Sequence, residues 1–234
     1  MRIYRKSLLS GAESARETAV VIDVFRAFTC ASIMLGYGLS RLLLEEDPGR
    51  VLELKRKHGY IALGEMDGKM VEGFDLGNSP VEIAAMGKWF FEGKTVVQRT
   101  SSGVRGIFAA VKNCHTVYAG SYTTAPALAA ALKEENPVEV HLVAMGWKGE
   151  EPAPEDELCA GFIHSLLDPS IPYDHLSAMQ EILSHESAQR FLRNDKPYFP
   201  PADIPLCLQT GLFEMAMKVE TTPAGLELRP RLNA

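Results

Sequence analysis

Short runs of apolar, often β-branched residues alternate along the chain with longer segments in which apolar residues recur with the period of a helix. This alternation is typical of helices that cover a largely parallel sheet. The predicted strands span residues 19–24, 41–45, 60–64, 95–98, 116–119 and 139–145. The pattern therefore predicts an α/β fold with mostly parallel or mixed sheets flanked by helices.

The segments between these strands carry helical patterns over residues 27–37, 48–58, 80–91, 103–112 and 123–134, and Pro48 and Pro80 suit the first turn of a helix. The character of the chain changes after Met145, where Gly, Pro and acidic residues precede helical patterns over 158–167 and 175–192. Alternating segments around Thr221, Thr222, Pro223 and Gly225 predict a β-hairpin within 213–232. We expect two closely packed lobes, residues 1–146 with most site motifs and residues 147–234 with helices and the hairpin.

Composition narrows the classes of partner. The net charge is −6 and no run of Lys and Arg forms a basic stripe, which argues against nucleic-acid binding. The longest apolar runs are far below the ~20 residues of a membrane span, and the N-terminus lacks a signal-peptide core. The four scattered cysteines predict reduced thiols. We expect a soluble cytoplasmic protein with a small-molecule substrate. Whether the chain forms a homodimer is left open by the sequence.

Polar residues follow several predicted strands. Ligands of open α/β sheets bind at the C-terminal ends of the strands, so these residues are the first candidates for a site. Carboxylates there suit a hard cation, whereas hydroxyls, backbone amides and Arg suit a phosphate. The candidates are Asp23, Arg26, Glu65, Thr100, Ser101, Ser102, Gly103 and Ser121.

Two of these candidates have both a functional and a structural interpretation. The stretch from Thr100 to Gly103 lies between a strand and a helix, where it either cradles an anion or caps the helix. Asp23 suits metal coordination, a nucleophilic role or an ion pair with Arg26. Phe25 stands where a haloacid-dehalogenase-like phosphatase has its second Asp, so that particular mechanism loses support.

Acidic residues also occur in two connecting segments. The stretch EGFDLGNSP, residues 72–80, contains Glu72, Asp75, Asn78 and Ser79 before a predicted helix start. Turn chemistry explains its Gly, Asn and Pro residues but not its carboxylates. Near residue 156 three successive acids precede another helix, where they either complement the helix dipole or bind a metal ion.

The order of six segments, VVIDVFRAFT, LGE, EGFDLGNSP, VVQRTSSG, AGSY and EDELCAG, resembles the 2-phosphosulfolactate phosphatase family over residues 19–161. The resemblance implies an α/β fold of two related lobes and Mg²⁺-dependent hydrolysis of 2-phosphosulfolactate to sulfolactate and phosphate, a step on a route to coenzyme M. The matching positions are Asp23, Arg26, Glu65, Glu72, Asp75, Asn78, Ser79, Gly103, Ser121, Glu155 and Asp156. One departure is TSSG, where the family often has a Thr-Thr-Asn-Gly turn, and this weakens the inference of the substrate more than that of the reaction.

The resemblance and the position of each residue together predict its role in the site. We predict Asp23, Arg26, Glu65 and Asp75 as catalytic residues, and Asn78, Ser79, Thr100, Ser101, Ser102, Gly103 and Ser121 as substrate-binding residues. The predicted Mg²⁺ ligands are Asp23, Glu65, Glu72, Asp75, Glu155 and Asp156, and Arg99 or Arg105 is available to the acidic end of the substrate. Attack by water and a covalent aspartyl-phosphate on Asp23 both stay open. The alternatives are a phosphatase of the same fold for another small acidic phosphate ester and a non-catalytic small-anion-binding protein.

Overall fold

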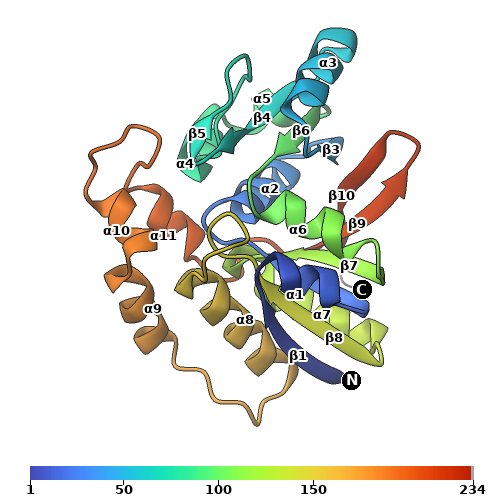
Figure 1. Cartoon of the computed structure of the whole chain (residues 1–234), viewed down its shortest axis with the longest axis vertical. Coiled ribbons are helices and arrows are strands. Elements are labelled where there is room, and N and C mark those ends of the chain that lie inside the picture. The colour runs from blue at the N-terminus through green and yellow to red at the C-terminus, as the bar shows by residue number, and fades with distance from the viewer. Residues whose placement is uncertain (233–234) are drawn as a thin grey trace.

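The computed structural model describes residues 1–232 and arranges their strands in one ten-stranded sheet with the order β1-β8-β2-β7-β9-β10-β3-β6-β4-β5 (Figure 1). Helices flank the sheet, which confirms the predicted α/β class. The strands are β1 Arg2–Ser7, β2 Glu17–Ile22, β3 Arg41–Leu44, β4 Ile61–Met66, β5 Lys69–Met70, β6 Thr95–Arg99, β7 Cys114–Gly120, β8 Glu139–Ala144, β9 Met215–Thr222 and β10 Gly225–Leu232. The helices are α1 Leu8–Ser14, α2 Ala27–Gly36, α3 Pro48–His58, α4 Pro80–Met86, α5 Lys88–Phe91, α6 Gly103–Ala110, α7 Ala125–Glu135, α8 Pro154–Leu167, α9 His175–Ser184, α10 Glu186–Leu192 and α11 Asp203–Cys207.

Strand β2 lies inside the sheet and pairs in parallel with β7 on one side and β8 on the other. Successive side chains of a strand point to opposite faces of the sheet. The continuous apolar run of β2 therefore packs into two cores, one on each face. Val21 belongs to the core that contains Ile107 of α6, and Val20 belongs to the core that contains Leu128 of α7 and Ile163 of α8. Burial on both faces explains why β2 reads as an unbroken apolar run.

The predicted hairpin is confirmed, and it lies in the middle of the sheet. Strands β9 and β10 pair with each other in antiparallel fashion, β9 also pairs with β7, and β10 also pairs with β3. The hairpin therefore joins the parallel group β1-β8-β2-β7 to the parallel group β3-β6-β4. The boundary between lobes at residue 146 stays a prediction.

The N-terminal pair β1 and α1 is not predicted by the apolar pattern. Strand β1 is an edge strand that pairs only with β8, in parallel, within the described sheet. Its sequence RIYRKS is mostly polar, because an edge strand with an exposed side needs few apolar residues. Because β1 lies at the edge of the sheet, it has no apolar run by which a strand would be predicted.

Two predicted helices are each divided in the structure. The pattern over 80–91 becomes α4 and α5, because Gly87 adopts a positive φ of 74° and ends α4. The pattern over 175–192 becomes α9 and α10, because His185 is extended and its side chain accepts the N–H of Ser187 as a cap. Both divisions keep the apolar period in register, so periodicity alone does not reveal them.

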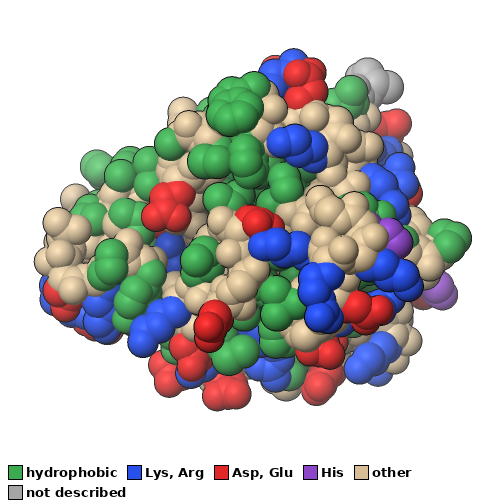
Figure 2. All heavy atoms as spheres, turned by 90° about the horizontal axis from the view of Figure 1, so that it is seen from above, with side chains coloured by type: hydrophobic (Ala, Val, Ile, Leu, Met, Phe, Trp, Pro, Cys, Tyr) green, Lys and Arg blue, Asp and Glu red, His purple; other side chains and the backbone are tan. Residues whose placement is uncertain are grey.

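The surface carries charges of both signs. On the face shown in Figure 2, Lys and Arg side chains are interspersed with Asp and Glu, with hydrophobic side chains between them. Over residues 1–232, no helix combines the length and the apolar character that crossing a membrane requires.

Candidate active site

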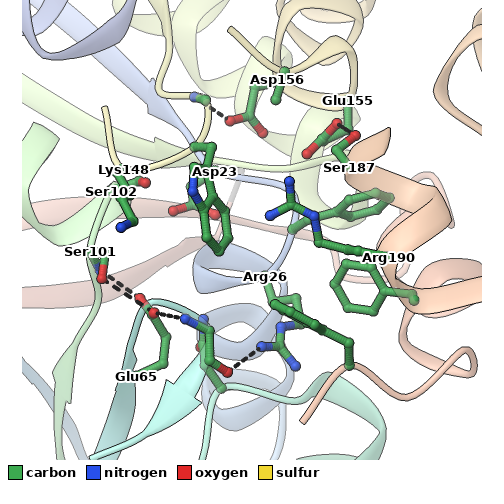
Figure 3. Close-up of a pocket in the computed structure, with 18 residues that line it drawn as sticks. Asp23, Arg26, Glu65, Ser101, Ser102, Lys148, Glu155, Asp156, Ser187 and Arg190 are labelled. Atoms are coloured by element: carbon green, nitrogen blue, oxygen red, sulfur yellow. Dashed lines mark hydrogen bonds between the residues drawn. The ribbon is translucent and has the colours of Figure 1, made fainter. Parts of the chain in front are cut away.

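A pocket opens where strand ends meet helices from the C-terminal part of the chain (Figure 3). The segments after β2, β4 and β6 contribute to its lining, as do the loop before α8, the start of α8, and α10. Eight of the residues singled out from the sequence line it, namely Asp23, Arg26, Glu65, Asn78, Ser101, Ser102, Glu155 and Asp156. Strand ends thus gather polar side chains at one place, as the rule for open α/β sheets requires.

Asp23 is buried and joins two helix starts. Its Oδ1 accepts the N–H of Ala27, the first residue of α2, at 3.1 Å, and its Oδ2 accepts the N–H of Gly103, the first residue of α6, at 2.8 Å. Free N–H groups and the positive end of the helix dipole favour an anion at such places. A Cβ at position 103 would lie 2.9 Å from Asp23 Oδ2, so this close approach requires glycine.

Glu65 fixes the turn between β6 and α6. Its Oε1 accepts the N–H of Ser101 at 2.6 Å, and its Oε2 accepts the N–H of Gly68 at 2.7 Å. Within the same turn, the hydroxyl of Thr100 accepts the N–H of Val104 and so acts as a helix cap. The hydroxyl of Ser102 makes no hydrogen bond in the part of the chain that the structure describes, and its residue lines the pocket. The turn therefore supplies a cap and a hydroxyl that is free for a ligand.

Glu155 and Asp156 occupy the first turn of α8 and are turned inward. Asp156 accepts the N–H of Val24 at 2.7 Å and the N–H of Gly146 at 2.8 Å. Glu155 accepts the hydroxyl of Ser187 at 2.6 Å. Complementing a helix dipole does not require burial, so the dipole alone does not account for these two acids.

These carboxyl groups are buried close to one another, and none of them forms an ion pair with a residue of the described range. Burial raises the pKa of Asp23 to about 6 and the pKa of Glu155 to about 7. Burial also raises the pKa of Asp156 well above its usual range, and the charges of Asp23 and Glu155 raise it further. The cluster would gain stability from a cation placed among its oxygens.

We therefore expect the protein without added metal ions to melt at a lower temperature at pH 8 than at pH 5. A carboxyl group with a higher pKa in the folded chain than in the unfolded chain binds its proton more tightly when folded. Its contribution to stability is therefore lost as the pH rises from its unfolded value, about 4, toward about 6 for Asp23 and about 7 for Glu155.

Melting followed by circular dichroism in the presence of a chelator measures this effect. Glu155→Gln removes one of the titrating groups, so its melting temperature should fall less than that of the wild type between these pH values, by roughly 5 °C. Parallel declines in the two proteins would contradict the expected effect of Glu155.

Arg26 is buried and contacts groups from the C-terminal part of the chain. Its Nη1 donates to Asp203 Oδ2 at 3.0 Å and to the carbonyl oxygen of Tyr198 at 2.9 Å. Its guanidinium carbon lies 5.3 Å and 5.2 Å from the ring centres of Phe191 and Phe199. Arg26 is thereby fixed at the pocket wall by residues more than 160 positions away.

Asn78 and Ser79 precede α4 beside the pocket. The buried Oδ1 of Asn78 has no hydrogen-bond partner among the described residues, and Asn78 lines both this pocket and a neighbouring hollow. The hydroxyl of Ser79 accepts the N–H of Glu82 as a helix cap and donates to Asp203 Oδ1 at 2.7 Å. Asn78 thus has a free acceptor, whereas the hydroxyl of Ser79 is already engaged.

The structure does not bring every predicted residue into the pocket. Glu72 is exposed, and Asp75 forms an ion pair with Lys55 at 2.6 Å while accepting the N–H of Ala62 at 2.9 Å. Ser121 is fully buried and hydrogen-bonds to another hydroxyl instead of lining the pocket. The hydrogen bond and the ion pair of Asp75 attach the 72–80 segment to β4 and α3, which gives its carboxylate a structural use.

Several pocket residues escape sequence reasoning. Trp147 and Lys148 follow β8, and Ser187 and Arg190 lie on α10. The rule on strand ends would have indicated the first two, since they come directly after a predicted strand. Nothing in the local sequence distinguishes Arg190 from an ordinary surface residue of a helix.

Comparison with known proteins identifies the family of the chain. The chain matches the model of the 2-phosphosulpholactate phosphatase family over residues 4–222. It is 28% identical over 204 residues to a probable 2-phosphosulfolactate phosphatase of Bacillus subtilis (strain 168), covering 86% of each chain. A protein of the same description from Synechocystis sp. (strain ATCC 27184 / PCC 6803 / Kazusa) is 29% identical over 196 residues, which are 82% of this chain and 79% of that protein. These matches confirm the resemblance, and the chain belongs to the 2-phosphosulpholactate phosphatase family of phosphoric monoester hydrolases.

Proposed function

We propose that this enzyme hydrolyses 2-phosphosulfolactate to sulfolactate and inorganic phosphate in the pocket around Asp23. The family match and the descriptions of the relatives support this substrate. The observation that carries the proposal is that four carboxyl groups, a free hydroxyl and a free guanidinium from distant parts of the chain line one pocket. Such a set can bind a dianionic phosphate and also handle protons or a cation beside it.

The turn between β6 and α6 is the phosphoryl-binding element of this proposal. Ser101 and Ser102 line the pocket directly before α6, and the N-terminus of that helix attracts anions. The hydroxyl of Ser102 is free to donate to a phosphoryl oxygen. Because Glu65 holds the backbone of the turn, the hydroxyl of Ser102 needs little rearrangement when the substrate binds.

Mg²⁺ is part of the proposal. In the described range 1–232, no three His, Cys, Asp or Glu side chains already lie close enough together to hold a metal ion. Enzymes that act on phosphates commonly bind Mg²⁺ through one or two carboxylates, with phosphate oxygens and water as the other ligands. The oxygen donors of Asp23 and Asp156 fit this requirement. When bound, Mg²⁺ would neutralise charge on the phosphoryl group and favour ionisation of a bound water.

The reaction breaks the bond between phosphorus and the ester oxygen. An oxygen nucleophile forms the new bond to phosphorus, the electron pair of the broken bond goes to the ester oxygen, and that oxygen takes up a proton. Asp23 is held by two N–H donors at the pocket wall. From there it either accepts a proton from the attacking water or attacks phosphorus itself to form an aspartyl-phosphate that water then hydrolyses.

Phosphate release from four esters tests the proposal. The substrates are 2-phosphosulfolactate, phospholactate, phosphoglycolate and phosphoglycerate, each assayed with Mg²⁺ and with a chelator. We expect kcat/KM to be at least about 100-fold higher for 2-phosphosulfolactate, because a site built for one polar group rejects analogues that lack it. A preference for another ester would change the substrate, no turnover of any ester would favour the anion-binding alternative, and full activity with chelator would contradict the role of Mg²⁺.

We also place the reaction in the cytoplasm. All four cysteines are free and three of them are buried, which suits a reducing compartment. The oligomeric state stays a prediction.

A further inference from the structure

Three cationic side chains line the pocket, and two of them are already paired. Arg26 donates to Asp203 and to two backbone carbonyl groups. Lys148 forms an ion pair with Asp67 at 2.6 Å. Arg190 makes no hydrogen bond and no ion pair with any residue of the described range. Of these three cations, Arg190 alone has its donors available to a ligand.

The position of Arg190 is nevertheless fixed. Its guanidinium carbon lies 4.1 Å from the centre of the Trp147 ring and 5.9 Å from that of Phe199. Stacking uses the flat faces of a guanidinium and leaves its N–H groups free in the plane. The side chain is half-buried on α10, and burial lowers its pKa. Arg190 is therefore a partly dehydrated cation that forms no ion pair within the described residues.

The charges of Glu151, Glu155 and Glu186 act on Arg190, but none of these acids forms an ion pair with it. Glu155 accepts the hydroxyl of Ser187 instead of an N–H of Arg190. On the same helix, Glu186 pairs with Arg193 on the protein surface. Figure 3 shows Arg190 projecting into the pocket from the side opposite Ser101 and Ser102. A ligand with its phosphoryl group at the serine turn would extend toward Arg190.

From these observations we propose that Arg190 binds a non-reacting acid group of the substrate, its carboxylate or its sulfonate, and so determines specificity. This inference rests on the proposed function, and it assigns the acid end to Arg190 instead of Arg99 or Arg105. Arg99 donates to Glu65 and Glu46 carbonyl groups and Arg105 to that of Lys148. A planar guanidinium can donate two parallel hydrogen bonds to two oxygens of a sulfonate or a carboxylate. The substrate class is thus a small phosphate ester that carries a second strong acid.

Steady-state kinetics of Arg190→Met tests this assignment with three esters. For 2-phosphosulfolactate we expect kcat/KM to fall about 100-fold, mostly through KM, because hydrogen bonds to a charged group are lost. For propyl phosphate, which has no second acid, the change should stay below about 3-fold. Phospholactate retains a carboxylate but no sulfonate, so its loss shows which acid Arg190 contacts. Arg190→Lys should recover part of the loss, and Arg193→Met, directly after the same helix, serves as the matched control.

Two kinetic outcomes would overturn the assignment. Equal losses for all three esters would place Arg190 at the phosphoryl group, and unchanged kinetics would remove it from the site. Calorimetric binding separates these failures from failure of the proposed function. Titration of sulfolactate and of inorganic phosphate into Arg190→Met needs no turnover. Weakened binding of sulfolactate with unchanged binding of phosphate would support the assignment even if the wild type hydrolyses none of the esters, and any other pattern would oppose it.

Discussion

Asp23→Asn should abolish hydrolysis of phosphate esters while the protein stays folded. The amide has nearly the same shape as the carboxylate, but it can neither attack phosphorus nor accept a proton, and it binds cations poorly. We expect turnover to fall about 1,000-fold or more, which corresponds to roughly 4 kcal/mol of activation free energy. Phosphate release at saturating substrate measures this loss.

Thermal melting of the same variant separates catalysis from folding. Burial disfavours the charged form of Asp23, so loss of the charge offsets the poorer fit of the amide to two N–H donors. The melting temperature should stay within about 3 °C of that of the wild type. Asp195→Asn makes the same chemical change at an exposed position and should retain full activity. Normal turnover by Asp23→Asn would rule out both proposed roles of Asp23.

Asp203→Ala should cause the largest loss of stability among the substitutions considered. Asp203 is fully buried and accepts from Arg26, from the hydroxyl of Ser79 and from the N–H of Val81. Its removal leaves the guanidinium of Arg26 buried without a counterion. Breaking a buried pair on one side commonly costs about 3–5 kcal/mol, so the free energy of unfolding should fall by that amount.

Urea denaturation of three variants distinguishes the ion pair from simple packing. Ser79→Ala removes one hydrogen bond and a helix cap and should cost about 1 kcal/mol. Glu186→Ala breaks an Arg–carboxylate pair on the surface, and it should cost less than about 1 kcal/mol. A cost for Asp203→Ala no larger than that of Glu186→Ala would show that the buried pair does not hold the C-terminal segment to Arg26.

Local sequence patterns predict the strands that the structure shows beside the pocket. Strands such as β2 and β8 are buried on both faces, so each is an apolar run whatever the rest of the chain does. Polar residues directly after β2, β4 and β6 follow from the rule that ligands bind at strand ends. The edge strand β1 escapes prediction because its exposure removes the apolar signal.

Whether an individual residue takes part in binding or catalysis is harder to predict from the same patterns. From the sequence, Asp23 at the end of an apolar run and Asp75 in the segment EGFDLGNSP are both predicted as catalytic residues and Mg²⁺ ligands. The structure places Asp23 between two helix N-termini in the pocket and Asp75 in an ion pair with Lys55 outside its lining. A carboxylate in a motif therefore does not reveal whether its partner is a ligand or a neighbouring side chain.

The sequence by itself determined the α/β class, most strands, the hairpin and the family, because these depend on residue types at short spacings. Only the tertiary structure decided that Arg26 meets Asp203, 177 positions later, and that Arg190 stacks on Trp147 at the pocket wall. The physical reason is that ion pairs, stacking and burial depend on distances in space. Those distances are set when the hairpin joins the two parallel groups and the C-terminal helices pack beside them, and no local pattern records them.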